Sequence, residues 1–507
     1  MKAENKTEPR SLKELRAEID RIDAELLKLF SERMDVCSEV AEYKAESGRQ
    51  VYDPVREREK LDAIAAAAPA EYSDGARALW QTLFEVSRER QERIIGEKKL
   101  RCGLLGEHLG HSYSRPIHER LGAYVYDYFE KSPEEVEDFL KNGNWDGINV
   151  TIPYKITAAK FCDVPSDAAR ATGSVNTLVR RDGKTYGYNT DVRGFIRLVQ
   201  RSGVELSGKK VLVLGSGGAS RAVCYALESQ GARPVVISRS GEDNYGNIDR
   251  HRDASAIVNA TPVGMYPDNG KSPIDLSVFD NLEVVFDLIY NPSRTAFLQQ
   301  ADKFGIPGYN GLYMLVAQAA ESSSLFTGNI LNDRLIDEIT EKIERDTLNV
   351  ILIGMPGCGK TAKGKIIAEK LDREFIDADE ETEKLLGMPI PEFIRSQGED
   401  AFRRAETETL AKICKLSGKV IATGGGCVTR PENLPLLRQN GKIVLILRDL
   451  SELPTDGRPL SQGRGVEALF KEREPLYRAF ADYTVQTEKG GSADGAAAEI
   501  LKVLNLL

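Results

Sequence analysis

The sequence lacks the features that mark metal-binding, membrane or nucleic-acid-binding proteins. Its seven cysteines include no Cys-x-x-Cys pair and its four histidines form no ligand cluster, which favours reduced thiols in a cytoplasmic protein. No apolar run approaches the roughly 18 residues of a membrane span, and the Lys- and Glu-rich start has no apolar segment typical of a secretion signal. The net charge of −9, without a basic run, argues against nucleic acid or a membrane as a partner. We therefore expect a cytoplasmic protein.

The composition is otherwise ordinary for a globular protein, with 41% apolar and 29% charged residues, and a length of 507 residues is typical of about three domains. One motif defines the last domain. The stretch 349–353, apolar after Asn349, leads into a glycine-rich loop, and a helical pattern over 362–371 follows. The loop has the sequence Gly354-Met-Pro-Gly357-Cys-Gly359-Lys360-Thr361.

This order of strand, loop and helix predicts a phosphate-binding loop. The glycines let backbone N–H groups converge on phosphate oxygens, Lys360 adds a positive charge, and the Thr361 hydroxyl can ligate Mg²⁺. A glycine-rich turn without phosphate is the alternative interpretation, which the flanking strand and helix disfavour. Because such a loop follows the first strand of its domain, we expect an α/β nucleotide-binding domain over 345–507.

Residues 1–98 are predicted to be all helical. Residues 11–47 contain neither glycine nor proline, so the first helix should be long. Its apolar residues recur at alternating spacings of three and four and form a stripe: Leu12, Leu15, Ile19, Ile22, Leu26 and Leu29. Asp53-Pro54 begins a second helix, and 74–98 forms a third. Three helices with one long arm rarely close a core alone, so the stripe should meet a partner.

Cations are also spaced along this first helix. Arg33 and Lys44 are eleven residues apart, which returns them to nearly the same face; solvated surface charge is the alternative interpretation. From Leu15-Arg16 to Glu59, and again in the last helix, the segment resembles the all-helical chorismate mutase family. The resemblance implies that Arg16, Arg33 and Arg56 bind the two carboxylates of chorismate, that Lys44 and Gln91 contact its ether oxygen, and that Asp53, Glu57 and Ser87 complete the pocket. It also implies a homodimer through residues 1–98, in which Arg16 enters the partner's pocket.

A second glycine-rich loop indicates a dinucleotide site. The strand pattern 209–214 runs into Gly215-Ser-Gly217-Gly218-Ala219-Ser220, and the helical run 221–229 follows. The next strand ends in Ser238-Arg239, where an NAD-binding protein would place an acidic residue, so NADP(H) is favoured. Glu242 and Asp243 leave NAD open as an alternative, because their carboxylates could repel a 2′-phosphate.

Six ordered motifs surround this loop: His111-Ser112-Tyr-Ser114, Asn149-Val-Thr151-Ile-Pro153-Tyr-Lys155, Gly173-Ser-Val-Asn176-Thr177, Asn189-Thr190-Asp191, Asn259-Ala-Thr-Pro-Val-Gly264-Met265 and Asn310-Gly311-Leu-Tyr-Met-Leu-Val-Ala-Gln318. Together they resemble shikimate dehydrogenase over 99–344, with a substrate lobe (99–200 and helices within 310–344) and an NADP-binding lobe (201–309). The resemblance implies that Lys155 and Asp191 transfer the proton when 3-dehydroshikimate is reduced. It places Ser112 and Ser114 on the substrate carboxylate, Asn176 and Gln318 on its ring hydroxyls, and Thr151 in the same site.

The motifs after the phosphate loop are Asp377-Ala-Asp379, Phe402-Arg403-Arg-Ala-Glu406, Thr423-Gly424-Gly425-Gly426, Arg458-Pro-Leu and Arg473-Glu-Pro-Leu-Tyr477, and in order and spacing they resemble shikimate kinase. The resemblance implies that Asp379 is the base on the shikimate hydroxyl, that Arg403 and Arg473 bind the shikimate carboxylate, and that the backbone of Gly424, Gly425 and Gly426 faces its ring. Arg458 would be the lid cation, and Asp377 would hold Mg²⁺ through water. Taken singly, each of these charges has solvated surface charge as its alternative.

We therefore predict a chain of three enzymes: an all-α three-helix domain of the intertwined dimer type, an α/β two-lobed dehydrogenase with a Rossmann NADP lobe, and an α/β P-loop kinase. The expected substrates are chorismate, 3-dehydroshikimate and shikimate, and the expected cofactors are NADP(H), ATP and Mg²⁺. In one alternative, the helical unit is a dimerising module that senses chorismate or prephenate. In another, the kinase unit, whose segment 448–457 is short, is only a binding module.

Overall fold

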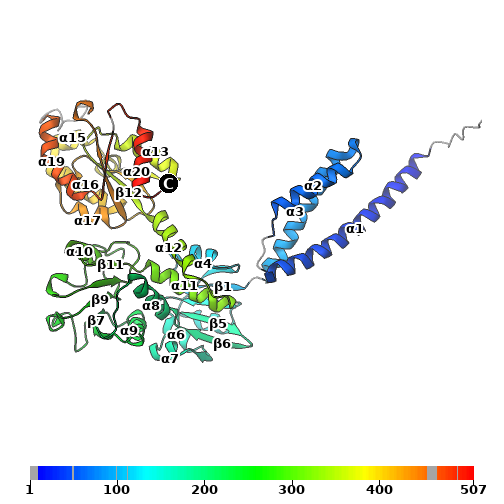
Figure 1. The fold of residues 1–507 in the computed structure, drawn as a ribbon, viewed down its shortest axis with the longest axis horizontal. Helices are drawn as coiled ribbons and strands as arrows, with labels where there is room; N and C mark the ends of the chain where they lie inside the picture. Colours follow the sequence, from blue (N-terminus) through cyan, green and yellow to red (C-terminus); the bar gives the residue numbers. More distant parts are fainter. Residues whose placement is uncertain are drawn as a thin grey trace, which may run out of the picture. The chain divides into compact units, whose positions relative to one another are not determined.

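The structure, a computed structural model, describes residues 10–47, 51–98, 100–110, 112–453, 465–487 and 489–506. It divides into two compact units. The first comprises Met1–Gly103, Gly122–Tyr128 and Asn144–Gly147, and the second comprises Leu104–Leu121, Phe129–Gly143 and Ile148–Leu507. The predicted order of fold classes is confirmed: helices come first, and α/β segments follow (Figure 1). Within the described ranges, no helix combines the length and apolarity needed to cross a membrane.

The N-terminal segment contains the predicted helices α1 (Leu12–Ser47), α2 (Pro54–Ala67) and α3 (Ser73–Lys98), with a 3-10 turn η1 (Ala70–Tyr72) before α3. Asp53 caps α2, because its carboxylate accepts a hydrogen bond from the Arg56 backbone N–H at 3.0 Å. α3 packs against both α1 and α2. The apolar stripe of α1 remains exposed, with Leu12 at 65%, Ile19 at 56% and Leu29 at 61%. This stripe therefore contributes little to the core of its own chain.

A mixed sheet forms the substrate lobe of the dehydrogenase segment, in the strand order β2-β1-β3-β5-β6-β4. Its strands are β1 (Arg101–Gly106), β2 (Val125–Glu130), β3 (Gly147–Val150), β4 (Val164–Pro165), β5 (Thr177–Arg181) and β6 (Lys184–Tyr188). The helices among them are α4 (Ser114–Leu121), α5 (Val136–Asn142), α6 (Lys155–Ala159) and α7 (Asp167–Thr172). Two longer helices, α8 (Thr190–Ser202) and α11 (Leu312–Thr327), pack along each other beside this lobe.

The second lobe has a parallel sheet in the order β11-β10-β9-β7-β8, as the dinucleotide fingerprint predicts. Its strands are β7 (Lys210–Leu214), β8 (Arg233–Ile237), β9 (Ala256–Asn259), β10 (Val284–Asp287) and β11 (Gly308–Tyr309). Its helical elements are α9 (Gly218–Ser229), η2 (Ile248–His251), η3 (Leu276–Val278) and α10 (Ala296–Phe304). The sheet interior is mostly apolar, which is typical of a parallel sheet covered on both faces, and Asn259 and Asp287 are buried polar residues at the ends of β9 and β10.

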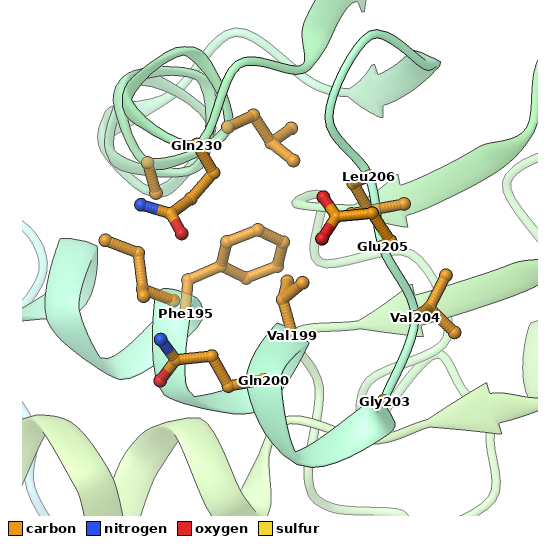
Figure 2. A pocket seen from close by; sticks show the side chains of 11 residues that line it. Phe195, Val199, Gln200, Gly203, Val204, Glu205, Leu206 and Gln230 are labelled. Atoms are coloured by element: carbon orange, nitrogen blue, oxygen red, sulfur yellow. The ribbon is translucent and has the colours of Figure 1, made fainter.

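A cavity of about 270 Å³ lies at the C-terminal turns of α8 and α9 and the loop that precedes β7. Figure 2 shows the ring of Phe195 between the side chains of Gln200 and Gln230, with Glu205 on the loop. Of the residues that line this cavity, none belongs to a predicted site. Asp191 lies in the first turn of α8, whereas the cavity lies toward the other end of the same helix.

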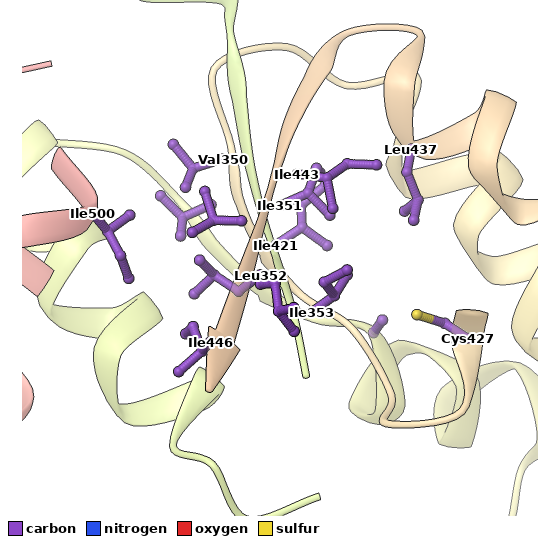
Figure 3. Close-up of a cluster of buried hydrophobic side chains, with 14 of the residues drawn as sticks. Val350, Ile351, Leu352, Ile353, Ile421, Cys427, Leu437, Ile443, Ile446 and Ile500 are labelled. Atoms are coloured by element: carbon purple, nitrogen blue, oxygen red, sulfur yellow. The ribbon is translucent and has the colours of Figure 1, made fainter. Parts of the chain in front are cut away.

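The kinase segment has a parallel sheet in the order β13-β14-β12-β15-β16. Its strands are β12 (Asn349–Ile353), β13 (Phe375–Asp377), β14 (Val420–Ala422), β15 (Gly441–Leu447) and β16 (Tyr483–Gln486). Its helical elements are α13 (Lys360–Leu371), α14 (Ala378–Leu386), α15 (Ile390–Gln397), α16 (Glu399–Ile413), η4 (Cys427–Thr429), α17 (Asn433–Arg438), η5 (Leu450–Glu452), α19 (Val466–Phe480) and α20 (Ala493–Val503). Figure 3 shows the core, where Leu437 and Ile500 approach the central strands from opposite sides.

One helix, α12 (Asp333–Thr347), joins the dehydrogenase and kinase segments. Its residues Ile336, Ile339 and Ile343 are buried in the same core cluster as α8 and α11. Only Leu348 separates the end of α12 from Asn349, the first residue of β12. The connection between the two segments is therefore a helix that ends one residue before the central strand of the kinase sheet.

Candidate active sites

The two residues predicted to transfer a proton in the dehydrogenase are in contact. The Nζ atom of Lys155, the first residue of α6, lies 2.6 Å from Oδ2 of Asp191, in the first turn of α8. Both side chains are largely buried, at 22% and 13% exposure. The Asn176 side-chain amide donates to Asp191 Oδ1 at 2.9 Å, so both carboxylate oxygens are engaged. A buried ammonium–carboxylate pair with an exposed edge is suited to proton transfer.

The predicted ring-binding residues surround this pair. Asn176 Oδ1 accepts the backbone N–H of Thr190 at 2.7 Å, and the Thr190 hydroxyl donates to Gln318 Oε1 at 3.2 Å. These bonds fix the orientation of the Asn176 amide, because its oxygen accepts from the Thr190 backbone and its nitrogen donates to the Asp191 carboxylate. Loop ends from β5 and β6 and helix α11 thus converge on one side of the Lys155–Asp191 pair.

The predicted carboxylate-binding serines lie together at the start of α4. The Ser112 and Ser114 hydroxyl oxygens are 3.0 Å apart, and the Ser114 backbone N–H donates to Ser112 Oγ at 3.1 Å. Ser114 is the first residue of α4. Thr151 directly follows β3, and its backbone N–H donates to the Leu105 carbonyl of β1 at 2.9 Å. All three residues therefore lie where strands of the substrate lobe end or a helix begins.

The dinucleotide loop has the expected geometry. Gly215 has φ +102, which favours glycine, and Gly217 precedes the first turn of α9. No atom lies within 4 Å of a Cβ built at Gly217 or Gly218, so the backbone at this helix N-terminus is open to a phosphate. Ala219 and Ser220 continue the first turn of α9. The loop therefore has the open glycine backbone before a helix that the dinucleotide-binding fingerprint predicts.

The turn after β8 explains how an arginine and two acids can share one loop. Arg239 is exposed, and the preceding Ser238 backbone N–H donates to the Asp243 carbonyl at 3.2 Å, which closes a tight turn. The Asp243 carboxylate lies 2.9 Å from Nε2 of the largely buried His251. One of the two acids that left NAD open is thus bound to a histidine. Sequence patterns gave no signal for this pair, because the lone His251 belongs to no motif.

Three glycines of the phosphate loop have positive φ angles: Gly354 (+144°), Gly357 (+85°) and Gly359 (+90°). Lys360 is buried, and its ammonium donates to the carbonyls of Gly354 at 2.9 Å and Met355 at 3.2 Å. The Thr361 hydroxyl donates to Asp377 Oδ2 at 2.8 Å, which brings the two predicted metal residues together. In the described residues, no group of three His, Cys, Asp or Glu side chains gathers as a metal site. The hydroxyl and single carboxylate fit Mg²⁺, which keeps several water ligands.

The predicted shikimate-binding residues line one cavity of about 620 Å³ with the phosphate loop, and they are Asp379, Arg403, Gly424, Gly425, Gly426 and Arg473. Protein surrounds the Asp379 carboxylate, although it keeps some exposure to the cavity. Burial, and then repulsion from Glu406, raise the pKa of Asp379 to about 6. The Arg473 guanidinium donates to the Gly425 carbonyl at 3.0 Å. The predicted lid residue Arg458 lies outside the described residues.

Two further charged residues in this segment were not assigned to a site. Glu406 Oε2 lies 2.8 Å from Arg403 Nη1, and both side chains are almost fully buried. A Cβ at Gly424 would meet Glu406 and would lie 2.6 Å from Asp379 Oδ1, so these carboxylates require glycine beside them. Lys363 is buried behind the phosphate loop, donates to the Cys358 carbonyl at 2.7 Å, and has its pKa lowered by burial. The three-residue spacing of Arg403 and Glu406 on one helix could have indicated their pairing.

In the helical segment, the structure brings only some of the predicted residues together. The Arg33 guanidinium donates to the Ser87 hydroxyl, and Gln91 lies one turn further along α3 and is buried. The Lys44 ammonium donates to the Val51 carbonyl at 2.7 Å. Glu57 forms an ion pair with Arg88 of α3, a partner that the sequence did not suggest. These contacts line the junction of α1, α2 and α3.

Arg16 lies apart from the other predicted mutase residues. It is exposed near the start of α1, 17 residues before Arg33. At 1.5 Å per residue, this separation corresponds to roughly 25 Å along the helix axis. Arg16 and Arg33 of one chain therefore cannot bind the same small molecule.

Comparison with known proteins gives a consistent assignment to all three segments. Residues 356–505 match the shikimate kinase family, residues 15–92 match chorismate mutase type II, and residues 104–178 match the shikimate dehydrogenase substrate binding domain. The chain is 34% identical over 264 residues to the shikimate dehydrogenase (NADP(+)) of Clostridium perfringens (strain SM101 / Type A), covering 48% of this chain and 97% of that protein.

Two other similarities have nearly the same extent. The shikimate dehydrogenase (NADP(+)) of Caldanaerobacter subterraneus subsp. tengcongensis is 36% identical over 269 residues, covering 48% of this chain and 95% of that protein. A crystal structure of a chorismate mutase/shikimate 5-dehydrogenase fusion protein from Clostridium acetobutylicum is 36% identical, with a TM-score of 0.47, over 49% of this chain and 98% of that chain. The predicted recognition of all three families is confirmed. The chain belongs to the shikimate dehydrogenase family and unites chorismate mutase, NADP-dependent shikimate dehydrogenase and shikimate kinase activities in one polypeptide.

Proposed function

We propose that Lys155 and Asp191 transfer the proton in the reduction of 3-dehydroshikimate to shikimate. Their contact of 2.6 Å, with Asn176 on the second carboxylate oxygen, is the observation that carries this proposal. As the substrate carbonyl becomes an alkoxide, the Lys155 ammonium donates a proton to its oxygen. Asp191 accepts a hydrogen bond from the ammonium and holds it in place for that step. NADPH, when bound, supplies the hydride.

The other predicted residues orient the substrate at this pair. Ser112 and Ser114 bind the carboxylate with two hydroxyls and a helix N-terminus, while Asn176 and Gln318 bind ring hydroxyls and Thr151 completes the pocket. The open backbone at Gly217 and Gly218 holds the NADP(H) pyrophosphate, and Arg239 holds the 2′-phosphate.

Lys155→Met tests this assignment. Shikimate oxidation should fall by about 10²- to 10⁴-fold, the range typical of a lost general acid–base residue, while kinase activity is retained. Lys160→Met, an exposed lysine at the end of the same helix, is the matched control. Lys155→Met turnover within about tenfold of the wild type would contradict the role in proton transfer.

For the kinase segment, we infer that Asp379 accepts the proton of the shikimate hydroxyl that attacks the γ-phosphoryl group of ATP. Arg403 and Arg473 bind the shikimate carboxylate, and the backbone of Gly424 to Gly426 lies against the ring. Lys360 and the lid residue Arg458 neutralise phosphate charge, and Thr361 and Asp377 hold Mg²⁺. Shikimate should be phosphorylated and 3-dehydroshikimate rejected, because only the reduced compound presents the hydroxyl that Asp379 requires. A rapid turnover of 3-dehydroshikimate would contradict this role.

For the helical segment, we infer that a homodimer builds each mutase pocket from both chains. Arg33, Lys44, Asp53, Arg56, Glu57, Ser87 and Gln91 come from one chain and Arg16 from its partner. The exposed stripe of α1 and the roughly 25 Å between Arg16 and Arg33 support this arrangement. The rearrangement needs a compact conformer of chorismate and charge stabilisation at the breaking C–O bond, which cations and amides supply. Mutase assays on the full chain distinguish this catalyst from a module that only senses chorismate or prephenate.

A further inference from the structure

The kinase segment contacts two loops of the NADP lobe through one turn. This turn, Gln439 and Asn440, connects α17 to β15, and both side chains are buried, at 3% and 5% exposure. The Asn440 side-chain amide binds both loops at once. Its Nδ2 donates to the Tyr266 hydroxyl at 2.8 Å, and its Oδ1 accepts the Ser293 backbone N–H at 2.9 Å.

Gln439 adds three more bonds to the same two loops. Its carbonyl accepts the Arg294 backbone N–H at 2.9 Å and the Ser293 hydroxyl at 3.1 Å, and its Oε1 accepts the Asn269 side-chain amide at 2.5 Å. The Lys415 ammonium donates to the Pro267 carbonyl at 3.2 Å. Five hydrogen bonds to one buried turn define a single arrangement of the two loops more sharply than exposed contacts would.

These loops occupy a functionally important edge of the NADP lobe. The first, from Ala260 to Asn269, follows β9, and the second, from Leu288 to Thr295, follows β10. In an open parallel α/β sheet, ligands bind outside the carboxyl ends of the strands, which is where both loops begin. The first loop begins with the Asn259–Met265 motif, and Met265 is 45% exposed directly before Tyr266.

A buried network connects the same two loops inside the dehydrogenase. The Asn259 side-chain amide donates to Asp287 Oδ1 at 3.0 Å, and Asn259 Oδ1 accepts the Thr261 hydroxyl at 2.7 Å. Asp287 also accepts the Thr295 hydroxyl at 2.5 Å. The strand-end side of each loop is therefore fixed by Asn259 and Asp287, and the outer side is fixed by the kinase turn.

The kinase turn has no part in its own domain's predicted site. Asn440 precedes Gly441, at the amino end of β15. In the same parallel sheet, the phosphate loop and Thr423 follow the carboxyl ends of β12 and β14, and Asp377 is the last residue of β13. A substitution at Asn440 can thus be judged by dehydrogenase kinetics with kinase activity as an internal control.

From these contacts, we propose that Asn440 and Gln439 of the kinase domain are positioning residues for the dehydrogenase: they hold the loops after β9 and β10 in the conformation that binds NADP(H). This inference rests on the proposed binding of NADP(H) at that sheet edge. The kinase domain then has a second role that does not depend on its own catalysis.

The test uses the full chain and the substitution Asn440→Ala, which removes the side-chain bonds to the Tyr266 hydroxyl and to the Ser293 backbone N–H. The Michaelis constant for NADP should rise about three- to tenfold, as expected for one or two lost hydrogen bonds, while kinase turnover stays within about twofold. Lys442→Ala, an exposed position two residues later, should leave both activities unchanged. Asn440→Asp should rescue the NADP constant, because its carboxylate can accept from both the Tyr266 hydroxyl and the Ser293 N–H.

A double-mutant cycle separates positioning from general destabilisation. Tyr266→Phe removes the same hydroxyl from the dehydrogenase side, so its effect should not add fully to that of Asn440→Ala. Asn440→Ala kinetics equal to wild type for NADP, or fully additive effects in the cycle, would overturn the proposal. If Asn440→Ala does not fold, Tyr266→Phe and Asn440→Asp still give the answer, since the former should raise the NADP constant and the latter should not. If the proposed binding of NADP(H) is itself wrong, the wild-type chain will not oxidise shikimate with NADP, and this outcome is distinct from any effect of Asn440.

Discussion

The hydroxyl of Thr361 lies 2.8 Å from the Oδ2 atom of Asp377, so the last residue of the phosphate loop and the last residue of β13 meet at one point. The Asp377 Oδ1 atom also accepts the Asp379 backbone N–H at 3.1 Å. One carboxylate thus links the proposed metal position to the residue proposed as the base.

Asp377→Asn should raise the Mg²⁺ concentration needed for half-maximal kinase rate, because it removes the negative charge beside the proposed ion. An increase of about tenfold is expected for one lost charge-assisted contact. The measurement is kinase rate against Mg²⁺ at fixed ATP, with Asp372→Asn at the far end of α13 as the control. An unchanged Mg²⁺ requirement would exclude Asp377 from the metal site.

Asp379→Asn should abolish phosphorylation and stabilise the protein at neutral pH. Burial and the neighbouring Glu406 carboxylate raise the pKa of Asp379 to about 6 in the folded protein, above the usual range of an aspartate, so the folded state binds the proton more tightly than the unfolded state. The raised pKa of Asp379 therefore stabilises the folded state at low pH, and this stabilisation is lost as the pH rises from about 4 to about 6. Above about pH 6, Asp379→Asn removes the buried charge and should increase the free energy of unfolding by up to about 3 kcal/mol.

Thermal unfolding at pH 5 and pH 8 checks this sign. The gain from Asp379→Asn should be larger at pH 8, whereas Glu369→Gln on the exposed face of α13 should give no such difference. A gain that is equal at both pH values would contradict the raised pKa. Kinase turnover by the wild type should also fall as the pH drops below about 6, because Asp379 becomes protonated.

Arg239→Ala should raise the Michaelis constant for NADP about ten- to a hundredfold and change that for NAD little, because only NADP presents the 2′-phosphate. The measurement compares both cofactors in the oxidation of shikimate. Arg233→Ala, an exposed arginine at the start of β8, is the control. Equal effects on the two cofactors would rule out a contact between Arg239 and the 2′-phosphate.

His251→Phe should reduce the preference for NADP without touching the cofactor. The histidine binds the Asp243 carboxylate at 2.9 Å, and its loss would release that charge within the turn that contains Arg239. A decrease of about three- to tenfold in the NADP/NAD specificity ratio is expected from one additional nearby carboxylate. His251→Phe combined with Asp243→Asn should restore the ratio; no restoration would mean that the histidine acts through folding alone.

Mixing two inactive mutase variants tests the proposed dimer. Arg16→Ala and Arg33→Ala chains should each lose mutase activity, and a heterodimer should contain one pocket with both arginines intact. After subunit exchange, activity should return to about a quarter of the wild-type level, since half the chains form heterodimers and each has one intact pocket. No recovery, despite demonstrated exchange, would show that each pocket comes from a single chain.

Local patterns predicted most of the fold. The largely apolar stretch 349–353 is strand β12, with the same bounds. The helix after it begins at Lys360 rather than 362, because Gly359 ends the loop and the helix starts at once. The glycine motifs also gave the dinucleotide loop, because positive φ values and open helix N-termini are local properties. The Lys155–Asp191 contact followed from the resemblance rather than from spacing.

Pairings between distant residues were not predictable in this way. Glu57 meets Arg88 from 31 positions away, and Asn440 meets Tyr266 from 174 positions away. Neither residue in the second pair belongs to a catalytic motif of its own domain, so only the packed structure reveals the contact. The position of Arg16 remains a prediction about a second chain, and that of Arg458 lies outside the described residues.

Helix α12 has a consequence for how the protein unfolds. Its buried isoleucines belong to the dehydrogenase core, yet its last turn is one residue from the central strand of the kinase sheet. Melting of either core therefore removes support from the end of the other, so heat should unfold the dehydrogenase and kinase segments in one cooperative transition. Cleavage at Leu348 should not release two separate enzymes, because the hydrogen bonds of Gln439 and Asn440 would still join the two segments.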